Sequence, residues 1–275
     1  CSNLSRIDLP VGVKTITGNC FLGCTSLKQV NADRNSKVLT STNGVLFNKA
    51  RTNLIVYPAG KTDEFYTVPS TVTVLGESSF AFSRIKEVDL KNVEVIDSGA
   101  FQYSNIRKID ITDKVYALGE AVFYYSNITD ITLGHGLTSI PKETFAYTSL
   151  LRKIEISNTI QVIGKSAFYY SSINTATFEK DSSLILFDSL SFKYSGLQKL
   201  DMPDSVIFVG AEAFAYASLS ELNIYDTSNL TQIGDSAFLS TSISKVNLPD
   251  SLQYLGQFSF AGTFLSSGRG STENF

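Results

Sequence analysis

The chain has 275 residues, of which 43% are hydrophobic and 18% charged, and this composition excludes both a disordered polypeptide and a highly charged one. Its 23 basic and 26 acidic residues give a net charge of −3, which argues against electrostatic capture of nucleic acid or anionic lipid. No apolar run reaches the length of about 20 residues that spans a bilayer, and a single histidine excludes a histidine-rich metal site.

The first 30 residues predict the beginning of a β-rich repeat. Alternating apolar residues predict a strand at Leu4–Leu9, a second apolar segment at Val13–Ile16, and a further strand that opens at Leu27–Val30. The segment Cys1–Ile7 aligns with the segment Cys24–Val30. We therefore expect this chain to be truncated at its N-terminus, within a repeat.

Three cysteines lie in this first part. Cys20 precedes Phe21, where later units have alanine, so we expect Cys20 to be a buried packing residue. Cys1 and Cys24 fall on adjacent rungs. We favour two free thiols over a disulfide between them, because side chains of in-register parallel strands often point the wrong way for such a bond. Cys1 is interpreted as a repeat position and not as a lipid-modified terminus.

Residues 38–66 interrupt the repeat. The distance from Phe21 to Phe80 is 59 residues, about 37 more than one unit. The apolar runs Val45–Phe47 and Leu54–Tyr57 flank a polar stretch. This arrangement predicts an inserted β-hairpin near residues 38–60.

From Phe80 onward, a unit of 21–24 residues recurs. It is marked by a phenylalanine that follows a small or polar residue: Phe80, Phe101, Phe123, Phe145, Phe168, Phe192, Phe214, Phe238 and Phe260. Five residues later, an isoleucine or leucine opens an alternating strand: Ile85, Ile106, Ile128, Leu150, Ile173, Leu197, Leu219, Ile243 and Leu265. After a polar turn, a second short apolar segment often ends in glycine: Gly119, Gly164, Gly210, Gly234 and Gly256.

One unit therefore supplies a strand, a turn, a short second strand and a tight corner. The phenylalanine fills the interior at the corner, and the glycine suits a close approach of the backbone. A single unit leaves its apolar face unburied, so units must stack. We predict a β-rich solenoid with parallel strands, built as a single domain of about ten 21–24-residue repeats over residues 1–265, with a flexible tail over residues 266–275.

This unit resembles the BspA-type leucine-rich repeat, whose pattern is L-x-x-[IVL]-x-[LIM]-P-x-x-V-x-x-I-G-x-x-A-F-x-x-[CST]-x-[LI]. The segment Gly44–Gly60 resembles a recurrent element of the same family. The resemblance covers residues 1 to about 265. It implies a curved, right-handed leucine-rich-repeat coil on secreted or cell-surface proteins. It also implies adhesion to host or neighbouring-cell proteins, and not catalysis.

Two other functions stay open: a structural spacer that presents another domain, and a polysaccharide-cleaving enzyme of the parallel β-helix type. The enzyme is less favoured, because a catalytic cluster would interrupt the repeat in mid-rod, and the units between Ile106 and Phe214 are the most regular. The sequence predicts no catalytic residues, no cofactor and no metal site.

The long strand offers one candidate binding surface, here called the strand face. Its third and fifth residues point outward by the strand period of two, and stacking arranges them in columns. The candidate binding residues of the strand face are Lys108, Asp110, Asp130, Lys153, Glu155, Lys199, Asp201 and Glu221. Their alternative role is a charge-balanced solvated surface that keeps a long sheet from aggregating.

A second candidate surface, here called the aromatic strip, lies two residues after the repeat phenylalanine. Its candidate binding residues are Tyr103, Tyr125, Tyr147, Tyr170, Tyr194 and Tyr216, with Phe82 as the first ring of the series. Small residues take this position at Gly23, Ser240 and Gly262. Stacked rings stabilise a rod, or they offer a strip to a sugar or a protein, and structural stacking is the favoured role.

We expect an extracellular or cell-surface location and a partner that is a host extracellular or cell-surface protein, or a glycan. We expect no nucleic-acid partner and no membrane insertion of this chain. His135 lies between two glycines in a turn, where it is expected to be solvated surface.

Overall fold

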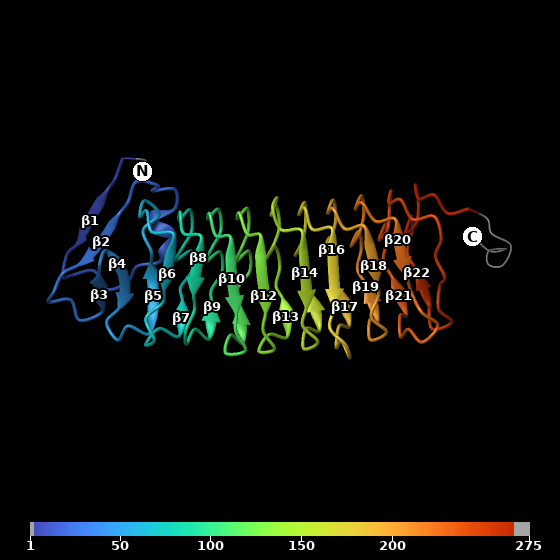
Figure 1. The fold of residues 1–275 in the computed structure, drawn as a ribbon, viewed down its shortest axis with the longest axis horizontal. Coiled ribbons are helices and arrows are strands. Elements are labelled where there is room, and N and C mark those ends of the chain that lie inside the picture. The colour runs from blue at the N-terminus through green and yellow to red at the C-terminus, as the bar shows by residue number, and fades with distance from the viewer. Residues whose placement is uncertain (1–2, 267–275) are drawn as a thin grey trace.

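The computed structural model describes residues 3–266 and has the predicted architecture, a parallel-strand β-solenoid of about 11 turns (Figure 1). A regular turn contains a long strand, a short strand and a corner, and equivalent elements of successive turns lie side by side along the rod. The predicted flexible tail falls almost entirely on residues outside this range.

The long strands form one wall of the rod. They are β1 (Arg6–Leu9), β2 (Gln29–Ala32), β6 (Phe65–Thr67), β8 (Glu87–Asp89), β10 (Lys108–Ile111), β12 (Asp130–Leu133), β14 (Lys153–Ile156), β16 (Thr175–Phe178), β18 (Lys199–Asp201) and β20 (Glu221–Asn223). Neighbouring strands pair in parallel except between β2 and β6 and between β12 and β14; for example, Lys108 of β10 lies opposite Asp130 of β12. Residues of β10 alternate between exposed and buried, so Ile109 and Ile111 enter the core, as the period of two predicts.

The short strands form a second wall. They are β7 (Val74–Leu75), β9 (Val95–Ile96), β11 (Ala117–Leu118), β13 (Ser139–Ile140), β15 (Val162–Ile163), β17 (Leu186–Phe187), β19 (Phe208–Val209), β21 (Gln232–Ile233) and β22 (Tyr254–Leu255). Each has only two residues, because the chain turns the corner immediately afterwards. Pairing is again parallel, for example between Val162 and Leu186.

The repeat phenylalanines stack along the rod at the corner. Successive ring centroids from Phe80 to Phe260 lie 4.6–5.6 Å apart, and neighbouring rings are within 20° of parallel. The repeat glycines allow adjacent turns to approach closely. A Cβ atom on Gly119 would lie 2.2 Å from the backbone nitrogen of Ser98, so no larger residue fits without a shift of the backbone.

The insertion is a three-stranded antiparallel meander of β3 (Leu39–Thr42), β4 (Val45–Asn48) and β5 (Asn53–Val56). The predicted hairpin is confirmed as β4 and β5, and β3 extends it by one strand that was not predicted. Asn43 and Gly44 form the turn between β3 and β4 with φ angles of 51° and 78°. Asn-Gly is a strong signal for a two-residue hairpin turn, so the sequence contained the evidence for β3.

The meander separates two hydrophobic clusters. Val45, Phe47 and Leu54 pack into the main core of the rod. Leu46 and Val56 belong to a smaller cluster, together with Leu9 of β1 and Val30 of β2. β5 joins the short-strand wall through β7, whereas β2 pairs only with β1, and the long-strand wall begins again at β6.

The prediction that Cys20 is buried is wrong, because its side chain is exposed. Cys20 lies in a short 3-10 helix, η1 (Gly18–Phe21), which replaces the regular corner in this turn. Cys24 is buried with a free thiol, and its suggested counterpart Cys1 lies outside the described residues.

Two later elements also differ from prediction. Leu151, and not Leu150, takes the core position of its unit, because this unit has one extra residue after its corner. The strand expected at residues 243–248 does not form. The preceding turn is longer around Tyr225, and an open cavity of about 320 Å³ separates Glu221 to Tyr225 from Ser244 to Asn247.

Both walls are interrupted in the middle of the rod: β11 does not pair with β13, and β12 does not pair with β14. In the short-strand wall, Pro141 occupies the repeat position of Gly119. The N–H group of Gly119 donates a hydrogen bond to the Ile96 carbonyl at 2.7 Å, whereas proline has no N–H group to donate. The long-strand wall is interrupted where this unit has its extra residue, immediately before Leu151. The phenylalanine stack continues across the interruption.

Candidate binding surfaces

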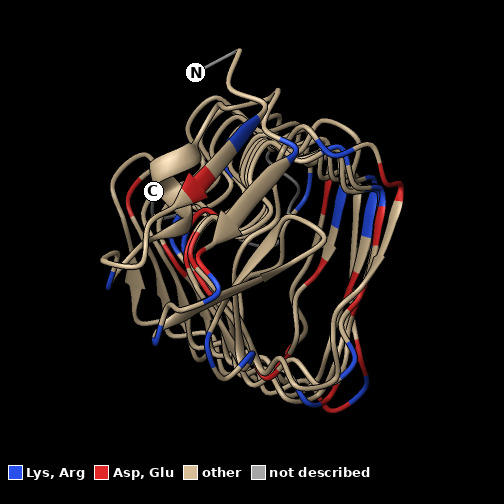
Figure 2. Cartoon of the chain, turned by 90° about the vertical axis from the view of Figure 1, so that its left-hand side faces the viewer, with Lys and Arg blue, Asp and Glu red and all other residues tan. Residues whose placement is uncertain are grey.

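The strand face lies on the long-strand wall, and all eight of its candidate residues are exposed. Figure 2 views the rod from its N-terminal side, and blue and red segments interleave along the strands at the right. The two columns therefore present alternating charge to solvent and not a patch of one sign.

Part of this charge is neutralised within the strand face. Lys199 Nζ lies 2.8 Å from Glu221 Oε1 and 3.4 Å from Asp201 Oδ1, and Lys108 Nζ lies 3.8 Å from Glu87 Oε1. The hydrogen bond to Glu221 raises the pKa of Lys199, and the hydrogen bond from Lys199 lowers the pKa of Glu221. In contrast, Asp110, Lys153 and Glu155 form no ion pair with any described residue.

The aromatic strip is one continuous stack. Seven rings from Phe82 to Tyr216 follow one another with centroids 4.4–5.5 Å apart and interplanar angles of 4–26°. The stack crosses the interruption of the walls, where Tyr125 and Tyr147 make its shortest contact at 4.4 Å. Each ring face inside the stack is therefore covered by a neighbouring ring, and the ring edges face outward.

The backbone of the strip has an uncommon conformation. All seven residues have positive φ angles between 51° and 58°, as does Ser240 at 53°, and Gly262 has a φ of 69° at the same repeat position. Glycine and small polar residues adopt this left-handed region most readily. The corner thus requires the conformation but not the aromatic side chain, because Ser240 and Gly262 support the same geometry.

Two further tyrosines widen the strip. Tyr124 packs edge-on against Tyr103, Tyr125 and Tyr147, with centroids 5.0–5.7 Å apart. Two turns further on, Tyr169 makes the equivalent contacts with Tyr147, Tyr170 and Tyr194. The sequence patterns did not single out these two residues, although each directly precedes a residue of the strip.

The strip remains accessible and carries little charge. Tyr103, Tyr125, Tyr170 and Tyr216 are 41–48% exposed. Burial and the neighbouring phenols raise the pKa of Tyr124 to about 12, so its hydroxyl is neutral at physiological pH. At the C-terminal end, Lys193 Nζ lies 5.2 Å from the ring centroid of Tyr194 and is paired with Glu212.

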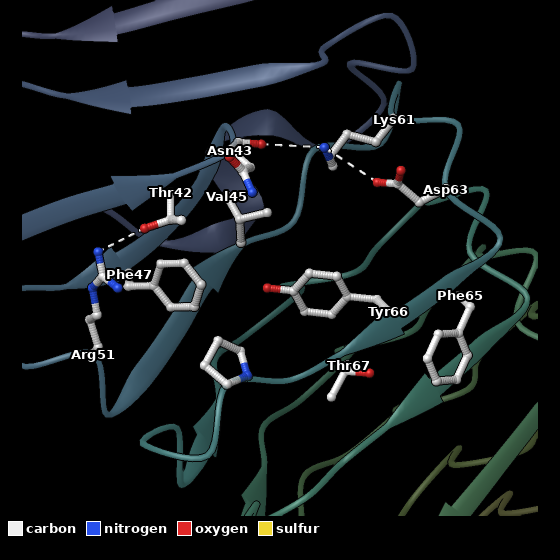
Figure 3. Close-up of a pocket in the computed structure, with 11 residues that line it drawn as sticks. Thr42, Asn43, Val45, Phe47, Arg51, Lys61, Asp63, Phe65, Tyr66 and Thr67 are labelled. Atoms are coloured by element: carbon white, nitrogen blue, oxygen red, sulfur yellow. Dashed lines mark hydrogen bonds and ion pairs between the residues drawn. The ribbon is translucent and has the colours of Figure 1, made fainter.

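The structure also contains a recess that was not predicted, here called the notch. It lies between the inserted meander and β6 and has a volume of about 440 Å³ (Figure 3). Its lining residues are Thr42, Asn43, Val45, Phe47, Arg51, Lys61, Asp63, Phe65, Tyr66, Thr67 and Pro69. The insertion itself could have predicted the notch, because an insertion between two repeats leaves a strand of the wall without its neighbour.

Within residues 3–266, no helix is long and apolar enough to cross a bilayer. The same residues contain no group of three His, Cys, Asp or Glu side chains placed to hold a metal ion.

No curated protein matches the chain in sequence. Among solved structures, a leucine-rich repeat protein from Eubacterium ventriosum is 19% identical with a TM-score of 0.54, over 98% of this chain and 62% of that chain. A leucine-rich repeat protein from Bacteroides ovatus is 21% identical with a TM-score of 0.50, over 95% of this chain and 77% of that chain. At these identities, the likeness concerns the fold. The chain spans 62% of the length of the first of these proteins.

Sequence matching to families covers almost the whole chain. Residues 1–126, 73–187 and 185–269 match the BspA type leucine rich repeat region, in 6 copies. This agrees with the repeat of phenylalanine, strand and glycine described above and with the solenoid that those residues build. The chain belongs to the BspA-type leucine-rich repeat family.

Proposed function

We propose that this chain is a secreted or cell-surface binding module, an adhesin that engages a host or neighbouring-cell protein through the aromatic strip. The observation that carries the proposal is the continuous, exposed stack of rings at a position where the backbone is equally satisfied by serine or glycine. The resemblance to the BspA-type family, which implies secreted or surface-attached proteins, supports the location.

The orientation of the rings favours a protein over a glycan. Sugars bind aromatic residues mainly through the ring face, and the faces inside the stack are already covered by neighbouring rings. The strip instead presents ring edges, which carry partial positive charge, and a row of hydroxyl groups. Carbonyl and carboxylate oxygens of a protein complement such a surface, and tyrosine is enriched in protein interfaces.

The strand face is the weaker candidate. Lys199 and Glu221 already pair with each other, and exposed pairs contribute little binding energy. Lys153 and Glu155 form no ion pair within residues 3–266, so a partner that contacts them would bind less tightly as salt rises. Salt dependence therefore distinguishes the two surfaces.

The test is a binding panel of extracellular-matrix proteins, plasma proteins and a glycan array at low and high salt. The triple variant Y125S/Y147S/Y170S removes the middle of the strip, and serine suits the backbone there, as Ser240 demonstrates. The matched control Y116S/Y225S/Y254S removes three tyrosines that are at least 50% exposed but lie outside the strip.

We expect a protein partner whose binding is lost in the strip variant and kept in the control variant. A partner that binds the strip variant as well as the unaltered chain would contradict the proposal. A salt-sensitive partner would move the site to the strand face, and an absence of partners would favour a structural spacer.

A further inference from the structure

We propose that the notch is a strand-acceptor site, in which an extended peptide segment of a partner protein adds to the free edge of β6. The site lies at the N-terminal end of the rod. It is independent of the aromatic strip and does not rest on the function proposed for it.

The edge of β6 has unpaired backbone groups. β6 pairs with β8 on one side only. The amide of Glu87 donates to the carbonyl of Glu64, and the amide of Val68 donates to the carbonyl of Asp89. Because successive residues of a strand face opposite neighbours, the amide and carbonyl groups of Phe65 and Thr67 point away from β8. No described residue forms a hydrogen bond with them.

The insertion explains why this edge is open. In the regular part of the rod, each long strand has a long strand of the preceding turn beside it. The meander displaces β2, which pairs only with β1, so the long-strand wall lacks a rung immediately before β6. Exposed edges of this kind are the usual sites for addition of a strand from another chain.

The notch can also hold the side chains of an added strand. The half-buried ring of Tyr66 extends into the recess, and Val45 and Phe47 of β4, which are almost fully buried, also line it (Figure 3). A volume of about 440 Å³ falls in the range of roughly 300–1,000 Å³ that is usual for binding pockets. Apolar side chains at alternate positions of the peptide would pack against the ring of Tyr66.

The rim selects an acidic peptide. Lys61 is paired with Asp63 at 3.3 Å, and Asp63 also accepts a hydrogen bond from the Tyr57 hydroxyl at 2.9 Å. Arg51 donates to the hydroxyl of Thr42 at 2.8 Å and has no acidic partner among the described residues. Its guanidinium is therefore the uncompensated charge of the notch, and it complements a carboxylate on the bound segment.

The predicted partner is thus an extended segment with apolar residues at alternate positions and an acidic residue between them. The probe is the fluorescein-labelled peptide acetyl-Thr-Ile-Asp-Ile-Thr-amide, and fluorescence anisotropy measures its binding to the full chain. Thr67→Pro removes one amide donor of the free edge, a substitution that edge strands tolerate where the amide faces away from the sheet. Thr67→Val keeps the donor and serves as the matched control.

We expect saturable binding that falls by about tenfold in Thr67→Pro, as for the loss of one or two hydrogen bonds, and stays unchanged in Thr67→Val. Arg51→Gln should weaken the peptide and remove its preference over the analogue with Asn in place of Asp. Methylation of the peptide amides that face β6 should abolish binding, whereas methylation of the alternate amides should not.

Several results would overturn the inference. These are an absence of peptide binding, equal binding by Thr67→Pro and Thr67→Val, or equal binding of the two methylated peptides. The methylated pair gives a decision even if Thr67→Pro does not fold, because it uses the unaltered chain. A dimer in sedimentation velocity that Thr67→Pro dissociates would assign the notch to a second copy of the chain instead.

Discussion

His135 Nε2 lies 3.0 Å from Glu179 Oε2, although 44 residues separate the two side chains in the sequence. The same carboxylate oxygen accepts a hydrogen bond from the backbone amide of Asn158 at 3.0 Å. On its other side, His135 Nδ1 lies 3.4 Å from Asp113 Oδ1. The contacts of His135 thus connect the turn of β10 to the turn of β16 across the interruption between β12 and β14. The side chain is exposed, as predicted, but it is also paired.

The first prediction concerns pH. The hydrogen bond to Glu179, and next the bond to Asp113, raise the pKa of His135 above its ordinary value of 6.5. Because the pKa of His135 is higher in the folded chain than in the unfolded chain, protonation of His135 stabilises the folded state. This stabilisation is complete below pH 6.5, and it is lost as the pH rises through the pKa of His135 in the folded chain. We expect the stability difference between the unaltered chain and His135→Gln to shrink from about pH 5.5 to about pH 8.5 in urea denaturation. A difference that does not vary with pH would show that the two carboxylates do not stabilise the imidazolium.

A second prediction concerns hydrogen exchange at the interruption. The backbone amide of Lys108 donates to Lys86, and that of Thr175 donates to Arg152, in the long-strand wall. The amide of Lys153, at the equivalent position, has no partner in the described part of the chain. We expect Lys153 to exchange with solvent much faster than Lys108 and Thr175 in native-state exchange measured by NMR. Equal protection at the three positions would mean that β12 and β14 pair in solution.

The third prediction tests the phenylalanine stack. Phe145 is fully buried between Phe123 and Phe168, at centroid distances of 5.4 Å and 5.1 Å. Phe145→Ala should lower the free energy of unfolding by about 3–5 kcal/mol, because it removes a large buried side chain and leaves a cavity. Phe258→Ala, at a side chain that is 69% exposed, should change the free energy by less than about 0.5 kcal/mol. Chemical denaturation of both variants measures the contrast, and similar losses would refute it.

The fourth prediction separates stacking from binding in the aromatic strip. Tyr147→Ser removes two stacked contacts, with Tyr125 and Tyr170, and two edge-on contacts, with Tyr124 and Tyr169. Since each aromatic pair contributes about 0.5–1.5 kcal/mol, the loss of stability should be at least about 2 kcal/mol. Tyr216→Ser removes one stacked contact, with Tyr194, and should cost about a quarter as much. Thermal and urea denaturation measure the loss. If neither variant lost stability, the stacked rings would have no structural role.

The fifth prediction concerns the close approach of adjacent turns. Gly119→Ala would place a Cβ atom 2.2 Å from the backbone nitrogen of Ser98, and one rung must shift to accept it. We expect a loss of about 1–3 kcal/mol, as is usual for overpacking. Gly12→Ala is the matched control, because no atom of the described residues lies within 4 Å of its added Cβ atom. Equal stability of the two variants in urea denaturation would remove the steric reason for the repeat glycine.

The repeated pattern of residues was enough to predict the solenoid, its core and the existence of the aromatic strip. Each turn repeats the same local pattern at nearly the same length, so equivalent residues such as Phe123 and Phe145 must meet when the turns stack. The same reasoning placed Tyr125 beside Tyr147 and turned Lys108 and Asp110 outward. These features need only contacts between adjacent turns, and a periodic sequence specifies such contacts directly.

Where the period fails, the geometry follows from the packing of the folded rod and could not be predicted from the repeat. The free edge of β6 depends on how the meander displaces β2, and the contact of His135 with Glu179 depends on a geometry that extends beyond the next turn. In each case, the outcome is set by the offsets between turns of unequal length, and those offsets are fixed only when the whole rod has packed.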